Sequence, residues 1–333
     1  MNILAPIDKV DDVEDVIKAG ANELYCGVIW DKWLSRYTIA AINRRPATIC
    51  NLQSFNALEE AVSIAHSYNA LVNLAINEHF YTQDQYPMLL DYIKKAIDAG
   101  VDSFIVADLN LILAIKDAGL ETSINVSTGI SIFNSETVKF LQKLGIDKVI
   151  FERHLTIDEI RDIVKNVTGV ETCVFIFNSR CPNVDGLCTF DHVQSLESSF
   201  KNSCMLPYSL SLYSDKPANR KSKSAIAHSN KAEIAFKRQQ VWTRLHMDDV
   251  PCGACALYDF VEMGVDCVKI VGRGNDLKRK INDVKFIRML LTLLQDKTIS
   301  RKQYIEQTRA FYKYVYRLPC RTAMCYYPEV REA

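Results

Sequence analysis

The feature that most constrains the fold is a junction between a helix and a strand that occurs four times. Each copy has a helical end, a glycine and a short apolar run, and the four copies are KAGANELYCGV at 18–28, DAGVDSFIVAD at 98–108, KLGIDKVIFER at 143–153 and EMGVDCVKIVG at 262–272. A glycine at this point accepts the left-handed backbone conformation that ends a helix. The repeat therefore predicts alternating helices and strands, which favours a parallel sheet.

Eight short apolar runs have the length of buried strands. They lie at residues 2–7, 23–28, 70–76, 103–108, 121–127, 148–153, 172–177 and 267–271. Eight such units favour an α/β fold of the closed (β/α)8 TIM-barrel type, with a doubly wound open sheet as the structural alternative. Helical patterns at 276–296 and 300–317 follow the last strand.

We expect one main domain, 1–296, followed by a C-terminal helix and tail, 297–333. Two segments interrupt the repeat: a loop at 29–53, and a long cysteine-bearing insertion at 178–255 before the last βα unit. A long loop inside a compact domain is usually functional or disordered. In a barrel, ligands bind where the strands end, so the insertion is expected to serve the site.

Charge and hydropathy exclude some classes of function. The chain has 40 Lys and Arg against 40 Asp and Glu, so no net field favours a nucleic acid or an anionic membrane. We expect no signal peptide before the first strand, and no apolar run approaches the roughly 18 residues that span a bilayer. We therefore expect a cytoplasmic protein with no membrane partner.

The chain has 11 cysteines, and in a reducing compartment clustered cysteines indicate a metal or catalytic site. Four follow the seventh strand with the spacing C-x6-C-x15-C-x47-C, namely Cys181, Cys188, Cys204 and Cys252. This spacing favours a loop-held iron–sulfur cluster over zinc, which prefers CxxC pairs. The only CxxC ends at Cys255, a reserve ligand, and no second one partners it. Unrelated thiols are the alternative.

Three stretches together resemble the collagenase-like peptidase family U32. They are the opening NILAPIDKVDDVEDVIKAGANELYCG, the middle from NALEEAVSIAHSYNALVNLAIN to FLQKLGIDKVIFERHLTIDEI, and the closing GVDCVKIVGR. The resemblance covers roughly residues 1–295 and implies the same barrel fold. The chain departs from the family pattern at His154, Phe177, Tyr208 and Val271.

The resemblance also implies a 4Fe–4S cluster. Cys181 and Cys188 match the family's cysteine pair after the seventh strand, and Cys204 matches a cysteine that a proline follows three positions later. Cys252 matches a cysteine 17 positions before the lysine of the closing signature, here Lys269. The roles of two tail cysteines are left open; they are Cys320 and Cys325.

From this resemblance we expect an iron–sulfur-dependent, oxygen-independent hydroxylase or related oxidoreductase that acts on a small molecule or an RNA base. Relatives of this kind serve ubiquinone biosynthesis and RNA modification, and a homodimer or a heterodimer with a related subunit is possible. One alternative is a peptidase or peptide-modifying enzyme, although the chain has neither G-x-S-x-G nor H-E-x-x-H. Another is a cluster-bearing partner subunit without its own catalysis.

Six polar residues at strand ends are further candidates for the site. The expected catalytic residues are Arg153, His154 and Lys269, and the expected substrate-binding residues are Asp108, Asn125 and Arg273. Arg273 lies between the last strand and a helix that starts near Asp276, with Asn275 as its expected cap. A helix N-terminus and a guanidinium both suit an anion, so Arg273 is expected to bind a carboxylate. Pairing with a neighbouring acidic side chain is the alternative.

The insertion also carries a basic segment at 216–246, with eight Lys and Arg against Glu233. Phosphate neutralisation by such a segment gives affinity for RNA, and Trp242 could stack on a base. The alternative is a solvated surface loop.

Overall fold

The computed structural model describes residues 1–38, 40–45, 49–179, 181, 183–188 and 250–331. Cys204 and the basic segment 216–246 lie outside the described residues, so the predictions made for them stay predictions. Among the described helices, none is both long enough and apolar enough to cross a bilayer.

Eight parallel strands form a closed barrel in which each pairs with the next and β8 pairs with β1. The strands are β1 Asn2–Pro6, β2 Glu23–Cys26, β3 Leu71–Ile76, β4 Ser103–Val106, β5 Ser123–Val126, β6 Lys148–Ile150, β7 Glu171–Phe177 and β8 Cys267–Ile270. Each coincides with a strand expected from the sequence. The (β/α)8 prediction is confirmed, and the open-sheet alternative is wrong.

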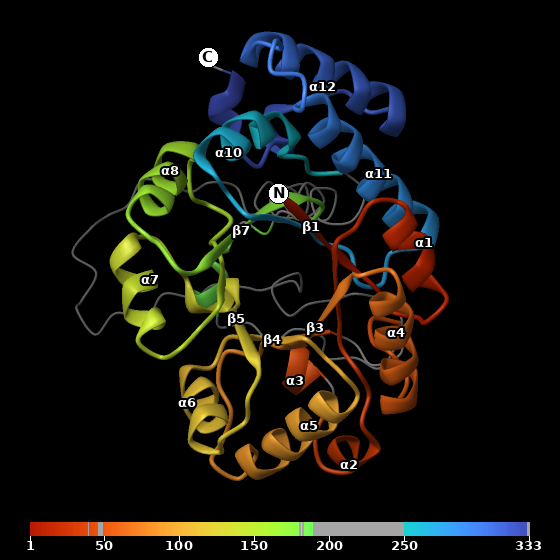
Figure 1. Ribbon diagram of the computed structural model, residues 1–333, viewed down its shortest axis with the longest axis vertical. Coiled ribbons are helices and arrows are strands. Elements are labelled where there is room, and N and C mark those ends of the chain that lie inside the picture. The colour runs from red at the N-terminus through yellow and green to blue at the C-terminus, as the bar shows by residue number, and fades with distance from the viewer. Residues whose placement is uncertain (39, 46–48, 180, 182, 189–249, 332–333) are drawn as a thin grey trace, which may run out of the picture.

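Helices surround the strands (Figure 1). Their buried apolar residues join those of the strands in one core. The longer helices are α1 Asp12–Lys18, α4 Phe55–Ser67, α5 Tyr86–Asp98, α6 Leu109–Asp117, α7 Ser135–Gln142, α8 Ile157–Lys165, α10 Leu257–Met263, α11 Leu277–Leu293 and α12 Arg301–Tyr316. The loop expected at 29–53 also contains two short helices, α2 Asp31–Leu34 and α3 Ala40–Asn43. The helical patterns at 276–296 and 300–317 are confirmed as α11 and α12.

Local sequence explains where these elements begin and end. Helix α8 starts at a capping box formed by Thr156 and Glu159, which satisfies N–H groups at the open end of the helix. The repeated junction is confirmed by its glycines, because Gly20, Gly100 and Gly264 all have positive φ, at 119°, 84° and 83°. A side chain there would be strained, so glycine is needed where the helix turns into the strand.

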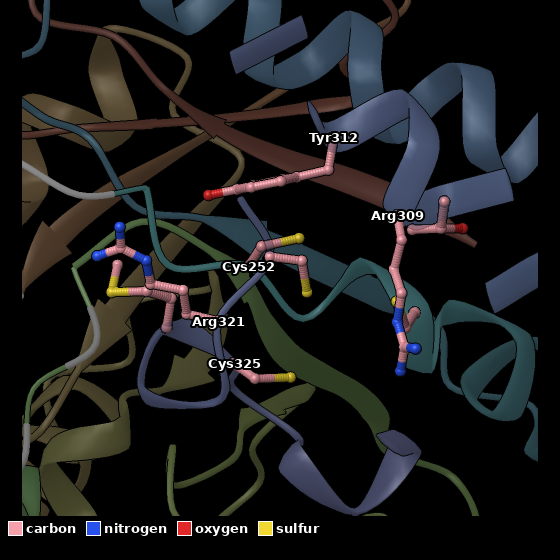
Figure 2. Close-up of a pocket in the computed structure, with 9 residues that line it drawn as sticks. Cys252, Arg309, Tyr312, Arg321 and Cys325 are labelled. Carbon is pink, nitrogen blue, oxygen red and sulfur yellow. The ribbon is translucent and has the colours of Figure 1, made fainter. Parts of the chain in front are cut away.

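The C-terminal tail is part of the packed structure. Helix α12 lies outside α10 and α11, on the side where the chain ends (Figure 1). The hydroxyl of Tyr312 donates to the Val250 carbonyl at 2.7 Å, and that of Tyr327 donates to the Phe175 carbonyl, also at 2.7 Å. The backbones of Cys252 and Cys325 pair as an isolated parallel β-bridge, which brings the end of the insertion to the tail. Both side chains are labelled in Figure 2.

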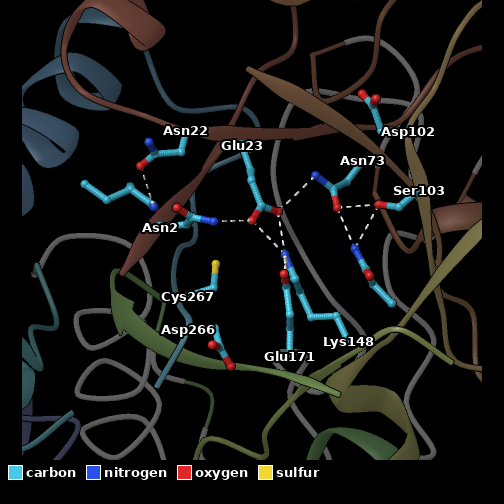
Figure 3. A network of polar contacts seen from close by, with 12 residues as sticks. Asn2, Asn22, Glu23, Asn73, Asp102, Ser103, Lys148, Glu171, Asp266 and Cys267 are labelled. Carbon is cyan, nitrogen blue, oxygen red and sulfur yellow. Dashed lines mark hydrogen bonds and ion pairs between the residues drawn. The ribbon is translucent and has the colours of Figure 1, made fainter. Parts of the chain in front are cut away.

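The amino-terminal half of the barrel interior contains a buried polar network (Figure 3). The Lys148 ammonium lies 2.7 Å from both carboxylate oxygens of Glu23. The amide of Asn125 donates to Asn73 Oδ1 at 2.6 Å and to Ser103 Oγ at 2.8 Å. These side chains fill this end of the barrel, so a ligand has to enter from the carboxyl end.

Candidate functional site

A pocket with about 360 Å³ of open space lies at the carboxyl ends of the strands. We call it the mouth pocket, and it is lined by Asn43, Arg44, Arg45, Asn77, Ser127, Thr128, Gly129, Arg153, Asp185 and Arg273. These residues follow β2, β3, β5, β6, β7 and β8, which is why a closed barrel brings them together. Four guanidinium groups against one carboxylate make the pocket suitable for an anion.

Arg273 is buried in this pocket with part of its guanidinium unpaired. Its Nη2 donates to the Asn43 carbonyl at 2.9 Å, whereas its Nη1 has no hydrogen-bond partner among the described residues. Gly27 leaves the necessary room, because a Cβ there would lie 3.0 Å from Nη1. A buried donor without a partner costs about 1–3 kcal/mol, which an anionic or carbonyl oxygen of a ligand would recover.

The mouth pocket also contains buried acceptors. Asn43 Oδ1 and Asn77 Oδ1 have no hydrogen-bond partner in the described part of the chain. The amide of Asn43 is fixed, because its Nδ2 donates to Asn51 Oδ1 at 2.7 Å. Unpaired donors and acceptors in one pocket suit a ligand that offers both, such as the edge of a nucleobase.

Arg44 and Arg45 were not predicted as site residues. Arg44 contacts the ring of His79, with Nη1 and Nδ1 2.8 Å apart. Burial and the positive charge of Arg273 lower the pKa of Arg45 to about 10. Burial, followed by the charge of Arg44, lowers the pKa of His79 to about 4, so this ring is neutral at pH 7. The feature of the sequence that could have indicated these two site residues is the pair of adjacent arginines inside the long 29–53 loop.

Arg153 lies in the pocket as expected. Its Nε is 2.9 Å from Asp185 Oδ2, and its guanidinium lies 4.2 Å from the ring centroid of Phe175. Burial acts to raise the pKa of Asp185, but the positive charges of Arg153 and Arg44 outweigh it and lower that pKa. Asp185 is therefore ionised at neutral pH and holds Arg153 in place.

His154 is adjacent to the site rather than part of the pocket lining. Its Nδ1 lies 2.7 Å from Glu152 Oε1. The other oxygen of that buried carboxylate accepts a hydrogen bond from Thr128 Oγ1 at 3.0 Å. Glu152 thus links His154 to the pocket wall, and a direct catalytic role of His154 stays a prediction.

Lys269 points into the barrel from β8, as predicted. Its ammonium lies 4.3 Å from the ring centroid of Tyr25 and 5.9 Å from that of Phe175. Burial lowers the pKa of Lys269 to about 7, and the charge of Arg273 acts in the same direction. An amine with such a pKa exchanges a proton readily at neutral pH, which general acid–base catalysis requires.

At the start of α11, carboxylates of the chain itself accept from two of the backbone N–H groups. The backbone N–H of Gly274 donates to Asp8 Oδ2 at 2.8 Å, and Lys280 pairs with the same carboxylate. The cap expected at Asn275 is wrong, because Asp276 caps the helix by accepting from the Arg279 N–H at 2.9 Å. Any anion in the mouth pocket would therefore contact Arg273 rather than the helix terminus.

Two of the predicted substrate-binding residues do not line the mouth pocket. Asp108 caps α6, accepting from the Leu111 N–H at 2.7 Å, and also accepts from the Tyr81 N–H at 2.9 Å. Asn125 belongs to the polar network deeper in the barrel. Both residues have structural roles, because their side chains form hydrogen bonds within the chain.

The predicted cluster cysteines divide between two places. Cys181 lies beside Arg153 and Cys188, and burial raises the pKa of its thiol to about 11, although the charge of Arg153 opposes the rise. Cys252 and Cys255 instead line a second pocket, which shares no residue with the mouth pocket. No three His, Cys, Asp or Glu side chains of the described residues are already in a metal-binding arrangement. The four-cysteine cluster thus stays a prediction.

Comparison with known proteins identifies the family. The model described as Peptidase family U32 matches residues 8–329, which is nearly the whole chain. The chain belongs to peptidase family U32. The resemblance inferred from the sequence motifs is therefore confirmed.

Individual relatives of this U32 protein differ in their described activities. It is 23% identical to tRNA hydroxylation protein P1 of Bacillus subtilis over 312 residues, which cover 92% of this chain and 67% of that protein. It is 29% identical to the 23S rRNA 5-hydroxycytidine C2501 synthase of Escherichia coli over 161 residues, which cover 47% of this chain and 24% of the synthase.

A protein described as a collagenase, from Porphyromonas gingivalis, is 23% identical over 212 residues, which cover 61% of this chain and 47% of that protein. A solved U32 peptidase structure matches with a TM-score of 0.42 and 16% identity, over 53% of this chain and 68% of the other. This U32 protein therefore spans about two thirds of the Bacillus relative and less than half of the other two curated relatives.

Proposed function

We propose that this U32 protein hydroxylates a base in RNA, with the mouth pocket as the active site. The observation that carries the proposal is the group of four arginines beside unpaired buried amide oxygens at the carboxyl end of the barrel. Arginines suit the phosphates of RNA or the carboxylates of a co-substrate, and the amide oxygens suit the donors of a base edge. The names of the tRNA and rRNA relatives support the same class of reaction.

In this proposal Arg273 and Lys269 have different tasks. Arg273 offers its unpaired Nη1 to an anionic oxygen, which fixes one end of the substrate. Lys269, whose pKa burial lowers to about 7, holds or releases a proton at Nζ deeper in the barrel. Arg153 is held by Asp185 and adds a second positive charge to the pocket lining.

The predicted 4Fe–4S cluster has partial support from the donors at the mouth. Cys181 and Cys188 supply soft sulfur ligands on one loop beside Arg153, whose positive charge favours thiolates. Cys204 is the predicted third ligand and Cys252 the fourth. When bound, such a cluster would carry the two electrons that the base loses when C–H becomes C–OH. A carboxylated co-substrate would supply the oxygen atom in place of dioxygen and be reduced by those electrons.

A peptidase is the second candidate, favoured by the described activity of the Porphyromonas relative. Hydrolysis by a serine nucleophile needs a serine hydrogen-bonded to a base. Among the described residues no serine hydroxyl contacts a histidine; His66 pairs with Asp102, and His154 pairs with Glu152. The arginines and unpaired amide oxygens of the mouth pocket support the hydroxylase instead.

The test is nucleoside mass spectrometry of tRNA and rRNA from cells that lack the gene. We expect the loss of a nucleoside one oxygen atom heavier than its parent, and its return with the wild-type gene, in air and without oxygen. The Arg273→Ala variant should fail to restore it, whereas Lys139→Met, which alters only an exposed ion pair with Glu136, should restore it fully.

An unchanged nucleoside profile in the deletion strain would contradict RNA hydroxylation. Cleavage of peptides by the purified wild-type protein but not by Arg273→Ala would favour the peptidase. If the wild-type gene restored the modified nucleoside in air but not without oxygen, the reaction would need dioxygen. That result would contradict the oxygen-independent reaction while leaving hydroxylation in place.

A further inference from the structure

A second pocket, outside the barrel wall, gathers four cysteines from two distant parts of the chain. We call it the tail pocket; it has about 360 Å³ of open space, and its lining includes Cys252, Cys255, Cys320 and Cys325. The first two cysteines begin the segment that leads into α10, and the other two lie in the tail after α12. The mouth pocket contributes no residue to it, so this is a separate place in the fold.

Backbone pairing fixes the two cysteine segments against each other. The Cys252 N–H donates to the Met324 carbonyl at 2.9 Å, and the Tyr326 N–H donates to the Cys252 carbonyl at 3.1 Å. Cys255 is one helical turn beyond Cys252, in the short helix η5 Ala254–Ala256, and it is near enough to interact electrostatically with Cys320 and Cys325. Figure 2 shows the thiols of Cys252 and Cys325 beside one open space that faces α12.

The spacing within each pair is the spacing of zinc ligands. Cys252 and Cys255 form C-x2-C, and Cys320 and Cys325 form C-x4-C. Structural zinc sites use pairs separated by two to four residues, because a short turn lets two sulfurs face one ion. In the sequence, no second CxxC pair accompanies the first. The structure supplies a partner pair from the tail.

We propose that the four cysteines of the tail pocket bind one zinc ion, which fixes the C-terminal tail to the barrel. The site would be closed, with four sulfurs and no open position for a substrate, so its role is structural. This inference goes beyond the proposed hydroxylase activity and does not depend on it.

The surroundings suit a tetrathiolate site, whose net charge is negative. Arg309 and Arg321 line the pocket, and the guanidinium of Arg331 donates to Cys320 Sγ at 3.3 Å. The backbone N–H of Ala254 donates to Cys252 Sγ at 3.4 Å. Such N–H groups and cations outside the ligand shell orient the sulfurs and offset their charge.

Zinc binding requires a local change in the thiols, because no three of the described side chains are yet at coordination distance. The Cys325 thiol lies 3.2 Å from the Tyr327 carbonyl, to which it donates. Loss of this proton removes the hydrogen bond, and rotation about one side-chain bond redirects the sulfur. The backbone pairing holds the two segments together, and in a zinc site the four sulfurs would turn to lie about 2.3 Å from the ion.

Two of these cysteines, Cys320 and Cys325, belong to the zinc proposal alone. Cys252 is the predicted fourth cluster ligand and Cys255 its reserve, and one thiolate does not complete both sites. The zinc proposal therefore assigns both to the tail pocket and leaves Cys181, Cys188 and Cys204 to the mouth cluster. The experiment is metal analysis of full-length protein purified without oxygen, for the wild type and for single serine variants. The matched control is Cys188→Ser, which alters a mouth thiol.

We expect one zinc ion per chain in the wild type and in Cys188→Ser. We expect at least a tenfold loss of zinc after dialysis for Cys320→Ser and Cys325→Ser, with iron content unchanged. Should the serine variants fail to fold, Co²⁺ can replace Zn²⁺ in the wild type. Cobalt should then give the intense thiolate-to-metal absorption of a tetrahedral four-sulfur site.

Three results would overturn the proposal. The first is unchanged zinc in the Cys320→Ser and Cys325→Ser variants, or a Co²⁺ spectrum without thiolate bands. The second is iron and sulfide, in place of zinc, that disappear with the same variants. The third is a disulfide between Cys252 and Cys325 in peptides mapped without reduction. Failure of the RNA test would leave the zinc inference unaffected, because its readout is metal content alone.

Discussion

The buried ion pair inside the barrel gives a quantitative test of the fold. Lys148 Nζ lies 2.7 Å from both Glu23 oxygens, and the side chains are only 6% and 2% exposed. Lys148→Met removes the cation and leaves a buried carboxylate. Breaking a buried pair in this way costs about 3–5 kcal/mol of the free energy of unfolding.

The lower end of this range is expected, because Glu23 keeps weaker donors. The amide of Asn2 lies 3.3 Å from Glu23 Oε1, and that of Asn73 lies 3.5 Å from Oε2. We therefore expect a loss of about 3 kcal/mol. Urea unfolding followed by circular dichroism measures it, with the midpoint and the slope reported separately.

The control is Lys139→Met, which breaks an exposed pair with Glu136, whose side chains are 46% and 77% exposed. Such a pair contributes less than about 1 kcal/mol. The double variant Glu23→Gln with Lys148→Met should recover part of the loss, because it removes the stranded charge. The reasoning would be refuted if Lys148→Met cost no more than the control, or if the double variant were less stable than the single one.

Three further predictions concern the mouth pocket. Arg273→Ala should raise the Michaelis constant at least tenfold, about 1.4 kcal/mol, and Arg273→Lys should rescue little because an ammonium lacks the planar fork; an unchanged constant contradicts the anion contact. Because burial lowers the pKa of Lys269 to about 7, from 10.5, the unfolded chain binds a proton between these pH values that the folded chain does not. Stability should therefore rise with pH across this window, and Lys269→Met should reduce that rise in a pH series of urea unfolding curves; an equal rise in both proteins argues against the lowered pKa. Cys181→Ser and Cys188→Ser should each lose most bound iron in anaerobic metal analysis while keeping zinc, since oxygen is a harder ligand than thiolate, and full iron in both would count against the mouth cluster.

Much of the barrel could be predicted from the sequence, because local patterns determine it. Apolar runs of strand length show which residues are buried, and a glycine such as Gly264 marks where a helix must end. In a closed barrel of parallel strands, the carboxyl ends of all strands lie at one end of the barrel. Arg153 and Arg273 could therefore be expected at the site before their contacts were known. These inferences need only the neighbouring residues along the chain and the right-handed βα connection.

The tertiary structure decided which polar groups line the mouth pocket. Arg44 and Arg45 reach the mouth pocket because the loop after β2 folds over the barrel, which no periodicity reports. Just before the helix expected to bind a ligand anion, the Gly274 N–H instead donates to Asp8, which is 266 residues away in sequence. A residue's type shows what it can bind, but not whether another side chain already binds it.

The tail pocket is the clearest case in which the sequence alone does not show which residues come together. Cys252 and Cys255 were predicted as ligands of the cluster, together with cysteines of the insertion. Packing of α12 and the tail against the barrel places Cys320 and Cys325 beside them instead. Spacing along the sequence can identify a pair of ligands on one turn, whereas the meeting of two pairs depends on long-range packing, so only the tertiary structure could reveal it.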